Sequence, residues 1–470
     1  MTEYTASGDV AHRSSEILAA LSGVLGSDAV VTGASIPVDY GTDESLHAVA
    51  VRPVAVVFPS DTKEVAEIVR LAAQWRVPLT ARGAGTGLCG GCIPDPGGLV
   101  VSFARMNRLL EVDTANHVAV VQPGLTLAEL DEATAAHGLV FPVFPGTNAA
   151  SLGGNVATNA GGMRAVKYGV TRSQVLGLEA VTGTGEVIRC GGRYVKATTG
   201  YDLTQLIVGS EGTLALVTEA TLRLHPRLVD TASLLAPFSS VAQVAAVVPR
   251  IVASGVAPMI LEYIDRATMK GLVGMNDLSL GVPDEVAAVT EAYLIVVLEG
   301  RDDQRLQVDV ADVAAQLAAA GAHDVYVLPA GQGAALLAAR ERAFWLVKAA
   351  GADDIIDMVV PRDKIPDFLA QVTEIARRHE SRVFGCGHAG DGNIHFSVYQ
   401  PDEGRRTDLL RTIYEAGMAM GGAISGEHGI GRAKSGYYQA LEDPGKVALQ
   451  RRIKQAFDPA GILNPGCLFD

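Results

Sequence analysis

The first half of the chain alternates two hydrophobic patterns. Apolar residues three and four positions apart predict amphipathic helices at Ser14–Leu25, Thr62–Trp75 and Thr126–His137. Short apolar runs bounded by glycine and proline predict strands between and after these helices. The strands are expected at Val54–Phe58, Pro78–Ala81, Leu99–Phe103, His117–Val121, Leu176–Val181, Glu186–Arg189 and Leu214–Leu224, with a hairpin turn at Thr182–Gly185. This region is therefore predicted to be α+β.

The pattern changes near residue 235, where alanine- and valine-rich helical spacing begins to alternate with strands. The predicted helices are Val241–Ala253, Gln304–Ala320, Gly333–Ala350 and Ile365–Arg378, and the predicted strands are Ile260–Ile264, Tyr293–Leu298, Val325–Leu328 and Val383–Gly385. A sheet covered by helices is the expected product, and it forms a second α+β domain. The expected division is a helical segment at 1–44, a glycine-rich domain at 45–228, the second domain at 235–420 and a helical C-terminal segment at 421–470.

Composition narrows the class of protein. The 470 residues are 48% hydrophobic and 19% charged, which excludes a disordered chain and allows more than one core. A formal net charge of −14 argues against nucleic acid as a partner. The first residues lack a basic stretch followed by an apolar core, and no run of about 18 apolar residues occurs, so neither a signal peptide nor a membrane-spanning helix is expected.

The five cysteines are scattered along the chain, which indicates reduced thiols and a cytoplasmic location. Cys89 and Cys92 form a lone C-x-x-C. A zinc site of that type requires a second pair, so these two are interpreted as packing residues of a glycine-rich loop.

Two glycine-rich turns carry the candidate chemistry. His388 and His395 lie in the first, and Glu427 lies in the second, beside a further histidine at 428. Two imidazoles and a carboxylate form a three-ligand set that leaves a divalent metal one open position for substrate. His428 would then be free to move a proton. The alternative is a group of ordinary hydrogen-bonded core histidines.

Three glycine-rich segments in the first half suggest a binding site for a long ligand. They are Arg82–Gly91, Ser151–Gly162 and Gly209–Leu214. Small residues permit close backbone approach to phosphate or to a flat ring, whereas a surface turn is the alternative for any one segment. The first segment satisfies G-x-G-x-x-G, but glycines and prolines follow it, so no helix can begin there and a Rossmann fold is excluded. A dinucleotide is the expected ligand, and the absence of P-loop and G-x-S-x-G motifs argues against nucleotide hydrolysis and esterase chemistry.

Six motifs follow one another along the chain: RGAGTGLCGG, SLGGNVATNAGGMRAVKYGVTR, GSEGTLALVTEATLRL, GHAGDGNIH, GEHGIG and DPAGILNPG. Together they resemble the FAD-linked D-2-hydroxyacid dehydrogenases, flavoproteins of the vanillyl-alcohol-oxidase type, from about residue 45 to 468. This family includes D-lactate, glycolate and D-2-hydroxyglutarate dehydrogenases. The resemblance implies an α+β fold with a two-part PCMH-type FAD-binding domain, an α+β cap domain, and a C-terminal helical segment that returns to the flavin.

The resemblance also assigns residues to roles. Its FAD contacts would be Arg82, Gly83, Ala84, Gly85, Thr86, Gly87, Gly90, Pro145, Gly146, Ser151, Gly154, Asn155, Ala157, Thr158, Gly162, Glu211, Gly212, Val217 and Asn464. His388, His395 and Glu427 would hold a divalent metal, zinc or manganese, and His428 would be the catalytic base. Relatives with covalent FAD attach it through a histidine in the first glycine-rich loop, and none stands there, so non-covalent FAD is expected.

The substrate positions depart from the hydroxyglutarate pattern. Arg340 matches the arginine that binds the substrate carboxylate in this family. At the positions of the family's partners for a second carboxylate, this chain has Phe344, Ile355 and Ser397. A second carboxylate would be buried without a partner at considerable cost. The expected substrate is therefore a monocarboxylate: D-lactate, glycolate, or a longer or aryl-bearing 2-hydroxy acid.

The implied reaction is oxidation of a D-2-hydroxy acid to the 2-oxo acid, with hydride transfer to flavin N5 and His428 as the base. An electron acceptor is implied as a second partner, whether a cytochrome, a quinone, an electron-transfer flavoprotein or a partner subunit. The resemblance allows a homodimer and attachment to the inner face of a membrane. Two alternatives stay open: a D-2-hydroxyglutarate dehydrogenase, and an auxiliary FAD subunit of a glycolate oxidase-type respiratory complex.

Overall fold

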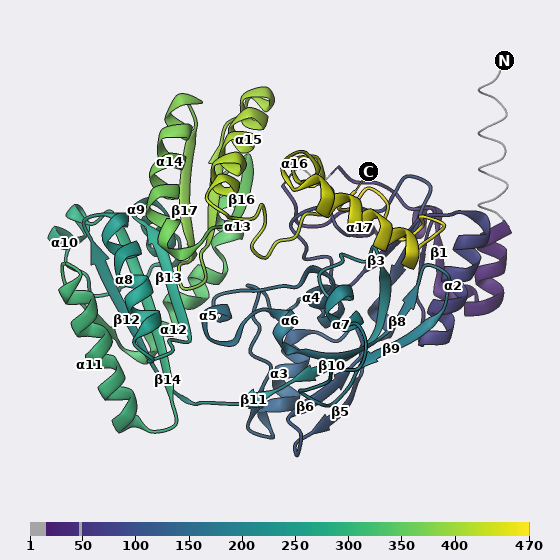
Figure 1. Cartoon of the computed structure of the whole chain (residues 1–470), viewed down its shortest axis with the longest axis horizontal. Helices are drawn as coiled ribbons and strands as arrows, with labels where there is room; N and C mark the ends of the chain where they lie inside the picture. The colour runs from purple at the N-terminus through teal and green to yellow at the C-terminus, as the bar shows by residue number, and fades with distance from the viewer. Residues whose placement is uncertain (1–15, 47–48, 470) are drawn as a thin grey trace.

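The computed structural model describes residues 16–46 and 49–469. Two lobes lie side by side, and the C-terminal helices cross back over the first lobe (Figure 1). No helix in the described part of the chain is long and apolar enough to cross a membrane.

The first sheet of the N-terminal lobe has the strand order β1-β2-β4-β3. Its strands are β1 (Val30–Thr32), β2 (Ala55–Val57), β3 (Leu79–Arg82) and β4 (Leu99–Ser102). Helix α2 (Thr62–Trp75) connects β2 to β3 and packs its apolar face on this sheet. Residues 16–25 form a helix whose Ile17 and Leu21 are fully buried in the same core, so the predicted N-terminal helix is confirmed from residue 16 onward.

The second sheet of this lobe is antiparallel, with the order β5-β6-β10-β8-β9. Its strands are β5 (Leu109–Asp113), β6 (Val118–Val121), β8 (Val175–Thr182), β9 (Val187–Gly191) and β10 (Ala215–Arg223), and β7 (Leu139–Val140) pairs with β11 (His225–Pro226). The helices are α3 (Leu127–Ala135), α4 (Leu152–Thr158), α5 (Ala165–Tyr168), α6 (Thr171–Gln174) and α7 (Leu203–Ile207). The predicted hairpin is confirmed, because Gly185 N donates to Thr182 O between β8 and β9.

The second glycine-rich segment is partly helical, although its glycine content is typical of a loop. The Ser151 side chain accepts a hydrogen bond from Gly154 N and caps α4, and Asn159 in the left-handed region ends it. Leu152 and Val156 lie one turn apart on the buried side. These local signals outweigh the glycine content of the segment.

The cap lobe is built on a seven-stranded antiparallel sheet with the order β15-β12-β14-β13-β17-β18-β16. Its strands are β12 (Asp230–Phe238), β13 (Ile260–Asp265), β14 (Ala292–Gly300), β15 (Tyr326–Leu328), β16 (Asp354–Val359), β17 (Arg382–His388) and β18 (Asn393–Tyr399). The helices are α8 (Val241–Ala253), α9 (Arg266–Asn276), α10 (Asp284–Val289), α11 (Asp303–Ala319), α12 (Ala330–Glu341), α13 (Ala343–Ala349), α14 (Ile365–Arg378) and α15 (Glu403–Ala419). The sequence predicts one helix at Gly333–Ala350, but the structure has two. The amide of Arg342 donates to Ala339 O, three residues back, and this tighter turn ends α12.

The two faces of the cap sheet differ. One face contributes apolar residues to the largest core of the protein, beneath α8, α11, α14 and α15. Alternation places the intervening side chains of β16, β17 and β18 on the other face. These are Ile355, Asp357, Phe384, Cys386, His388, His395 and Ser397. The part of this other face over β16, β17 and β18, the polar face, carries the candidate site, whereas its part over β12, β13 and β14 is mostly apolar and packs a separate core.

The C-terminal segment contains α16 (Ser435–Leu441) and α17 (Pro444–Phe457). Residues 458–469 are not helical, so the prediction of a fully helical segment is wrong there. The carboxylate of Asp458 accepts hydrogen bonds from the amides of Ile462 and Leu463 and closes a turn after α17. Leu79 N donates to Ile462 O, and Asn464 N donates to Leu79 O, so the segment lies beside β3 in the N-terminal lobe.

Candidate active site

An open cavity runs between the glycine-rich segments of the N-terminal lobe. Backbone from three distant glycine-rich segments lines it, which suits close approach of a long ligand such as a dinucleotide. Most residues predicted to bind the cofactor line it: Gly83, Ala84, Gly85, Thr86, Gly87, Pro145, Ser151, Gly154, Asn155, Ala157, Thr158, Glu211, Gly212 and Val217. Asn155 Nδ2 is buried without a hydrogen-bond partner among the described residues, which suits a group that meets a ligand.

The remaining predicted cofactor contacts lie elsewhere. Gly146 and Gly162 line a second cavity, and Arg82, Gly90 and Asn464 line neither. Arg82 Nη1 donates to Thr42 O at 2.6 Å, and Asn464 Nδ2 donates to the carbonyls of Gly91 and Glu211 at 2.8 Å each. Asn464 thereby joins two lining segments of the first cavity, whereas the bond of Arg82 reaches Thr42, which lies outside the lining.

Glu211 joins the two lobes. Its carboxylate accepts the amides of Ile430 at 2.9 Å and Gly431 at 2.7 Å. The third glycine-rich segment therefore positions the loop at 425–431, which carries Glu427 and His428. Glu211 also lines the cavity, so its contacts with the loop lie at the cavity wall.

Three of the predicted side chains converge where the lobes meet. His388 Nε2 lies 3.0 Å from Glu427 Oε1 and 3.3 Å from His395 Nε2, and His395 Nε2 lies 3.2 Å from the same carboxylate oxygen. Ligand atoms about 2.0–2.1 Å from a tetrahedral zinc ion stand about 3.3 Å apart, so the triangle has the size of a metal site. Glu427 Oε2 is also buried without a hydrogen-bond partner in the described structure. The residues fit a divalent ion.

Two buried carboxylates stand behind the imidazoles. His388 Nδ1 donates to Glu262 Oε1 at 2.5 Å, and His395 Nδ1 lies 3.6 Å from Asp357 Oδ1. Both carboxylates are fully buried. A carboxylate behind each imidazole directs the opposite ring nitrogen toward a metal.

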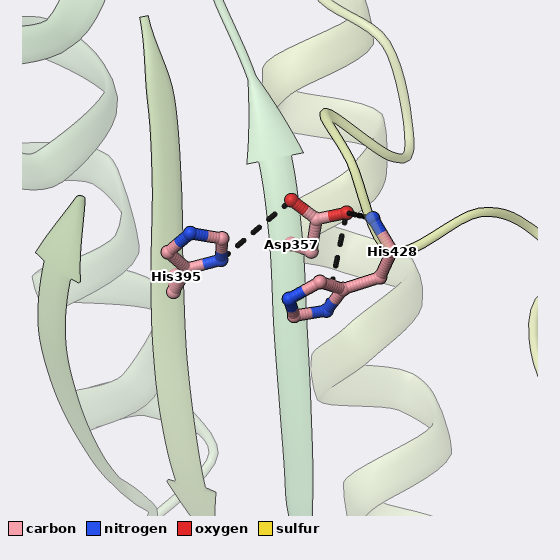
Figure 2. Close-up of side chains that lie close together, drawn as sticks. All are labelled: Asp357, His395 and His428. Carbon is pink, nitrogen blue, oxygen red and sulfur yellow. Dashed lines mark hydrogen bonds and ion pairs between the residues drawn. The ribbon is translucent and has the colours of Figure 1, made fainter. Parts of the chain in front are cut away.

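Asp357 also organises the 425–431 loop (Figure 2). Its Oδ2 accepts bonds from Ser425 Oγ and from the amides of Gly426, Glu427 and His428. Asp357, His395 and His428 form a second cluster of metal-ligating types. That cluster does not suit a metal, because the carboxylate oxygen that faces His428 already accepts four hydrogen bonds.

A second cavity of about 970 Å³ opens on the polar face of the cap sheet. It shares Glu427 and His428 with the first cavity, so the two meet at these residues. Arg340 of α12 and Phe344 of α13 both line it, and their contacts with substrate stay predictions. Arg340 is its one Lys or Arg among the described lining residues, and Nη2 of that side chain pairs with Glu262 at 2.9 Å.

Comparison with known proteins decides the family. Two family descriptions match the chain, FAD binding domain over residues 53–191 and FAD linked oxidases, C-terminal domain, over residues 229–468. A FAD-linked oxidoreductase of Mycobacterium tuberculosis, described as uncharacterized, is 54% identical over 97% of this chain and 99% of its own. A D-lactate dehydrogenase of Archaeoglobus fulgidus is 38% identical over 91% of this chain and 94% of its own. The chain belongs to the FAD-linked D-2-hydroxyacid dehydrogenases. The structure of p-cresol methylhydroxylase superposes with a TM-score of 0.79 at 16% identity, covering 97% of this dehydrogenase and 96% of that chain, which confirms the predicted PCMH-type fold.

FAD is the cofactor of this dehydrogenase, and the first cavity fits it. The glycine lining of the cavity and the unpartnered amide of Asn155 agree with a bound dinucleotide. The individual contacts stay predictions.

The electrostatics of the donor cluster in the dehydrogenase favour a cation. Burial raises the pKa of the Glu427 carboxyl, but His388 and His395 outweigh this effect and lower that pKa well below its ordinary value. Burial lowers the pKa of His388, but the carboxylates of Glu262 and Glu427 raise it well above its ordinary value. Positive charge is therefore favoured between His388 and Glu427, where a divalent ion would supply it.

His428 differs from the other imidazoles. Burial lowers its pKa to about 4, although Asp357 opposes this shift. Its ring stacks on His395 with centroids 5.0 Å apart and an interplanar angle of 13°. At neutral pH the imidazole is therefore uncharged and able to accept a proton.

Sequence reasoning missed Glu262 and Asp357. Each lies between apolar neighbours in a strand that has a second acidic residue at one end, in MILEYID and DIIDMVV respectively. A carboxylate with apolar neighbours on both sides is seldom buried without a partner, so this pattern is the signal that identifies such residues.

Proposed function

We propose that this dehydrogenase oxidises a D-2-hydroxy monocarboxylic acid to the 2-oxo acid with the help of a divalent metal, zinc or manganese, held by His388, His395 and Glu427. The proposal depends on one observation. The cofactor cavity and the second cavity meet at Glu427 and His428, so a substrate held by Arg340 would face the metal ligands and the cofactor together.

Arg340 and His428 have separate roles in the proposed reaction. Arg340 binds the substrate carboxylate in a mostly apolar cavity, where a charged hydrogen bond is strong. His428 takes the hydroxyl proton. Since His428 Nδ1 faces Asp357 Oδ2 at 4.0 Å, we assign the transfer to Nε2. When bound, FAD supplies the acceptor for the C2 hydride, and the metal supplies Lewis-acid polarisation of the hydroxyl.

The second cavity supports a substrate with one carboxylate and an apolar tail. Phe344, Ile355 and Ser397 all line it, and these are the positions where the hydroxyglutarate pattern would require polar partners. The apolar lining includes Leu88, Phe144, Met163, Phe344, Trp345, Val347, Ile355, Phe384 and Phe396. A second carboxylate would lose hydration there without gaining a cation. D-lactate, glycolate and longer or aryl 2-hydroxy acids therefore rank above D-2-hydroxyglutarate.

The test is anaerobic bleaching of the yellow FAD-loaded protein. Both enantiomers of lactate and phenyllactate, together with glycolate and D-2-hydroxyglutarate, are mixed with the protein without an electron acceptor. D-monocarboxylates should bleach the flavin, and a chelator should abolish bleaching until Zn²⁺ or Mn²⁺ is restored. Bleaching that survives complete metal removal would refute the metal's role, and failure of every 2-hydroxy acid would refute the reaction.

Reduced FAD must be reoxidised, so an electron acceptor is the second partner that we propose. Retention of the metal-ligand geometry favours a catalytic dehydrogenase over an auxiliary FAD subunit, which has no need of a metal site. An acceptor screen with cytochrome, quinone and electron-transfer flavoprotein distinguishes the candidates by the rate at which each restores the yellow colour.

A further inference from the structure

We propose that Glu262 is a positioning residue that fixes the metal site relative to the arginine for the substrate carboxylate. This inference rests on the proposed function, since it concerns the metal, which would polarise the substrate hydroxyl, and Arg340, which would bind the substrate carboxylate. Glu262 lines neither cavity, so it acts through its neighbours.

Glu262 lies in the middle of β13 in a row that is otherwise apolar. Ile260 and Ile264 flank it on the same face of the strand, and both belong to a hydrophobic cluster. The carboxylate is fully buried. A buried charge in such a place is costly unless it is paired and hydrogen-bonded, so its partners explain its presence.

The partners of Glu262 come from two other elements. Oε1 accepts the Nδ1–H of His388 at the end of β17, and Oε2 lies 2.9 Å from Arg340 Nη2 on α12. The strand register supports the first contact, because Tyr263 pairs with Gly387 and the next pair places Glu262 beside His388. Each carboxylate oxygen thus has one functional partner.

These two contacts have different consequences. The hydrogen bond to Nδ1 leaves the Nε2 lone pair of His388 directed at Glu427 and His395, and a carboxylate partner makes the imidazole a stronger metal donor. The ion pair holds the Arg340 guanidinium at the wall of the second cavity. One side chain therefore sets where the metal and the carboxylate of the substrate stand relative to each other.

The test is Glu262→Gln, measured on the FAD-loaded protein. A carboxamide has about the same size, but it is neutral and presents an N–H where the wild type has an acceptor. Zn²⁺ affinity, measured by competition with a chelator and without turnover, should fall about 10–100-fold. At saturating Zn²⁺, KM for D-lactate should rise about tenfold or more while kcat changes less, because the guanidinium loses its charged partner.

Glu299→Gln is the matched control. Glu299 lies on the neighbouring strand β14 with 6% of its side chain exposed, and its Oε1 pairs with Lys167 at 2.9 Å, away from the ligand cluster. This variant should keep both the Zn²⁺ affinity and KM. Equal losses in both variants would overturn the proposal, since they would reflect a weakened sheet.

Unchanged Zn²⁺ affinity and KM in Glu262→Gln would also overturn the inference while leaving the proposed function intact. If that variant does not fold, Glu262→Asp provides the same readouts, because the shorter side chain cannot reach both partners. Wild-type protein that binds no Zn²⁺ or Mn²⁺ would instead refute the metal-assisted function and the inference together.

Discussion

Glu427 and His428 are adjacent in the chain but face different partners. Glu427 Oε1 lies 3.0 Å from the Nε2 of His388, whereas the ring of His428 stacks on His395 and faces Asp357. Two adjacent residues therefore provide the side chain suited to bind a metal and the side chain suited to accept a proton.

Replacement of His428 tests its role as the base. His428→Asn should lower turnover about 10²–10⁴-fold, because the amide cannot take the hydroxyl proton. FAD content and Zn²⁺ affinity should stay at wild-type levels, since His428 is outside the ligand triangle. Steady-state rates with a dye acceptor measure the effect, and turnover close to wild type would remove His428 from the mechanism.

Replacement of Glu427 tests its role as a metal ligand. Glu427→Gln should weaken Zn²⁺ binding by more than the roughly 10–100-fold that loss of an outer carboxylate costs, because a direct ligand is neutralised. Chelator competition provides the measurement. Asp363→Asn is the control: Asp363 lies in the cap lobe outside both ligand clusters, with 70% of its side chain exposed, so its variant should bind Zn²⁺ normally. Equal weakening in the two variants would contradict the ligand assignment.

Among the structural elements, the 425–431 loop depends most on its neighbours. Asp357 binds its first half through backbone amides, and Glu211 binds its second half in the same way. The loop has no regular secondary structure of its own. Two buried carboxylates from different lobes therefore determine where its functional side chains lie.

A glycine in this loop provides a test of its packing. Gly431 has φ 54°, and a Cβ there would stand 1.9 Å from the carbonyl oxygen of Cys89. Gly431→Ala should lower the free energy of unfolding by at least about 1–2 kcal/mol and weaken FAD binding, since the first glycine-rich segment must shift. Thermal unfolding and FAD titration measure both effects.

Gly436→Ala is the control for this experiment. Gly436 lies in α16, and nothing stands within 4 Å of the position that a Cβ would take, so alanine should stabilise the helix by about 0.5–1 kcal/mol. A stable Gly431→Ala protein with normal FAD affinity would show that the loop tolerates displacement.

Elements with local signals were predictable. The apolar spacing predicts the bounds of α2 and α14 correctly. In the structure, Asp61 caps the start of α2 and left-handed Arg76 follows its end. The buried and exposed faces of α14 are clearly separated. Strands β12 and β16 were not predicted. DIIDMV in β16 mixes acidic and apolar residues, and its strand character comes from pairing with β18.

The candidate site was predictable where the chemistry lies in short motifs. His388, His395, Glu427 and His428 converge as the glycine-rich turns suggest. Glu262 was not identifiable as their partner, because its role arises from the register between β13 and β17, which are far apart in sequence. Long-range register of this kind is not encoded in any local pattern.

For the whole molecule, the cofactor cavity lies where several distant segments meet. Its lining draws on residues from 81 to 217 and on the 425–431 loop, so bound FAD would add contacts that all these segments share. FAD should therefore stabilise the entire N-terminal lobe. At a free FAD concentration one hundred times Kd, the free energy of unfolding should rise by about 2.7 kcal/mol.

Thermal scans of stripped and FAD-reloaded protein at several FAD concentrations measure this stabilisation. The unfolding midpoint should climb with the logarithm of the FAD concentration. AMP, which lacks the flavin half, is the control ligand and should shift the midpoint less. A midpoint that does not respond to FAD would contradict assignment of the cavity.

The backbone bonds between Leu79 and residues 462–464 have a consequence for biosynthesis. β3 emerges from the ribosome early, yet its neighbour on that edge is translated only after the whole cap. The nascent first lobe must therefore keep an open sheet edge, a template for unwanted pairing, until residues 462–464 have been made. Flavin loading is expected only after that point, and shortening the protein before residue 462 should yield aggregated, colourless material.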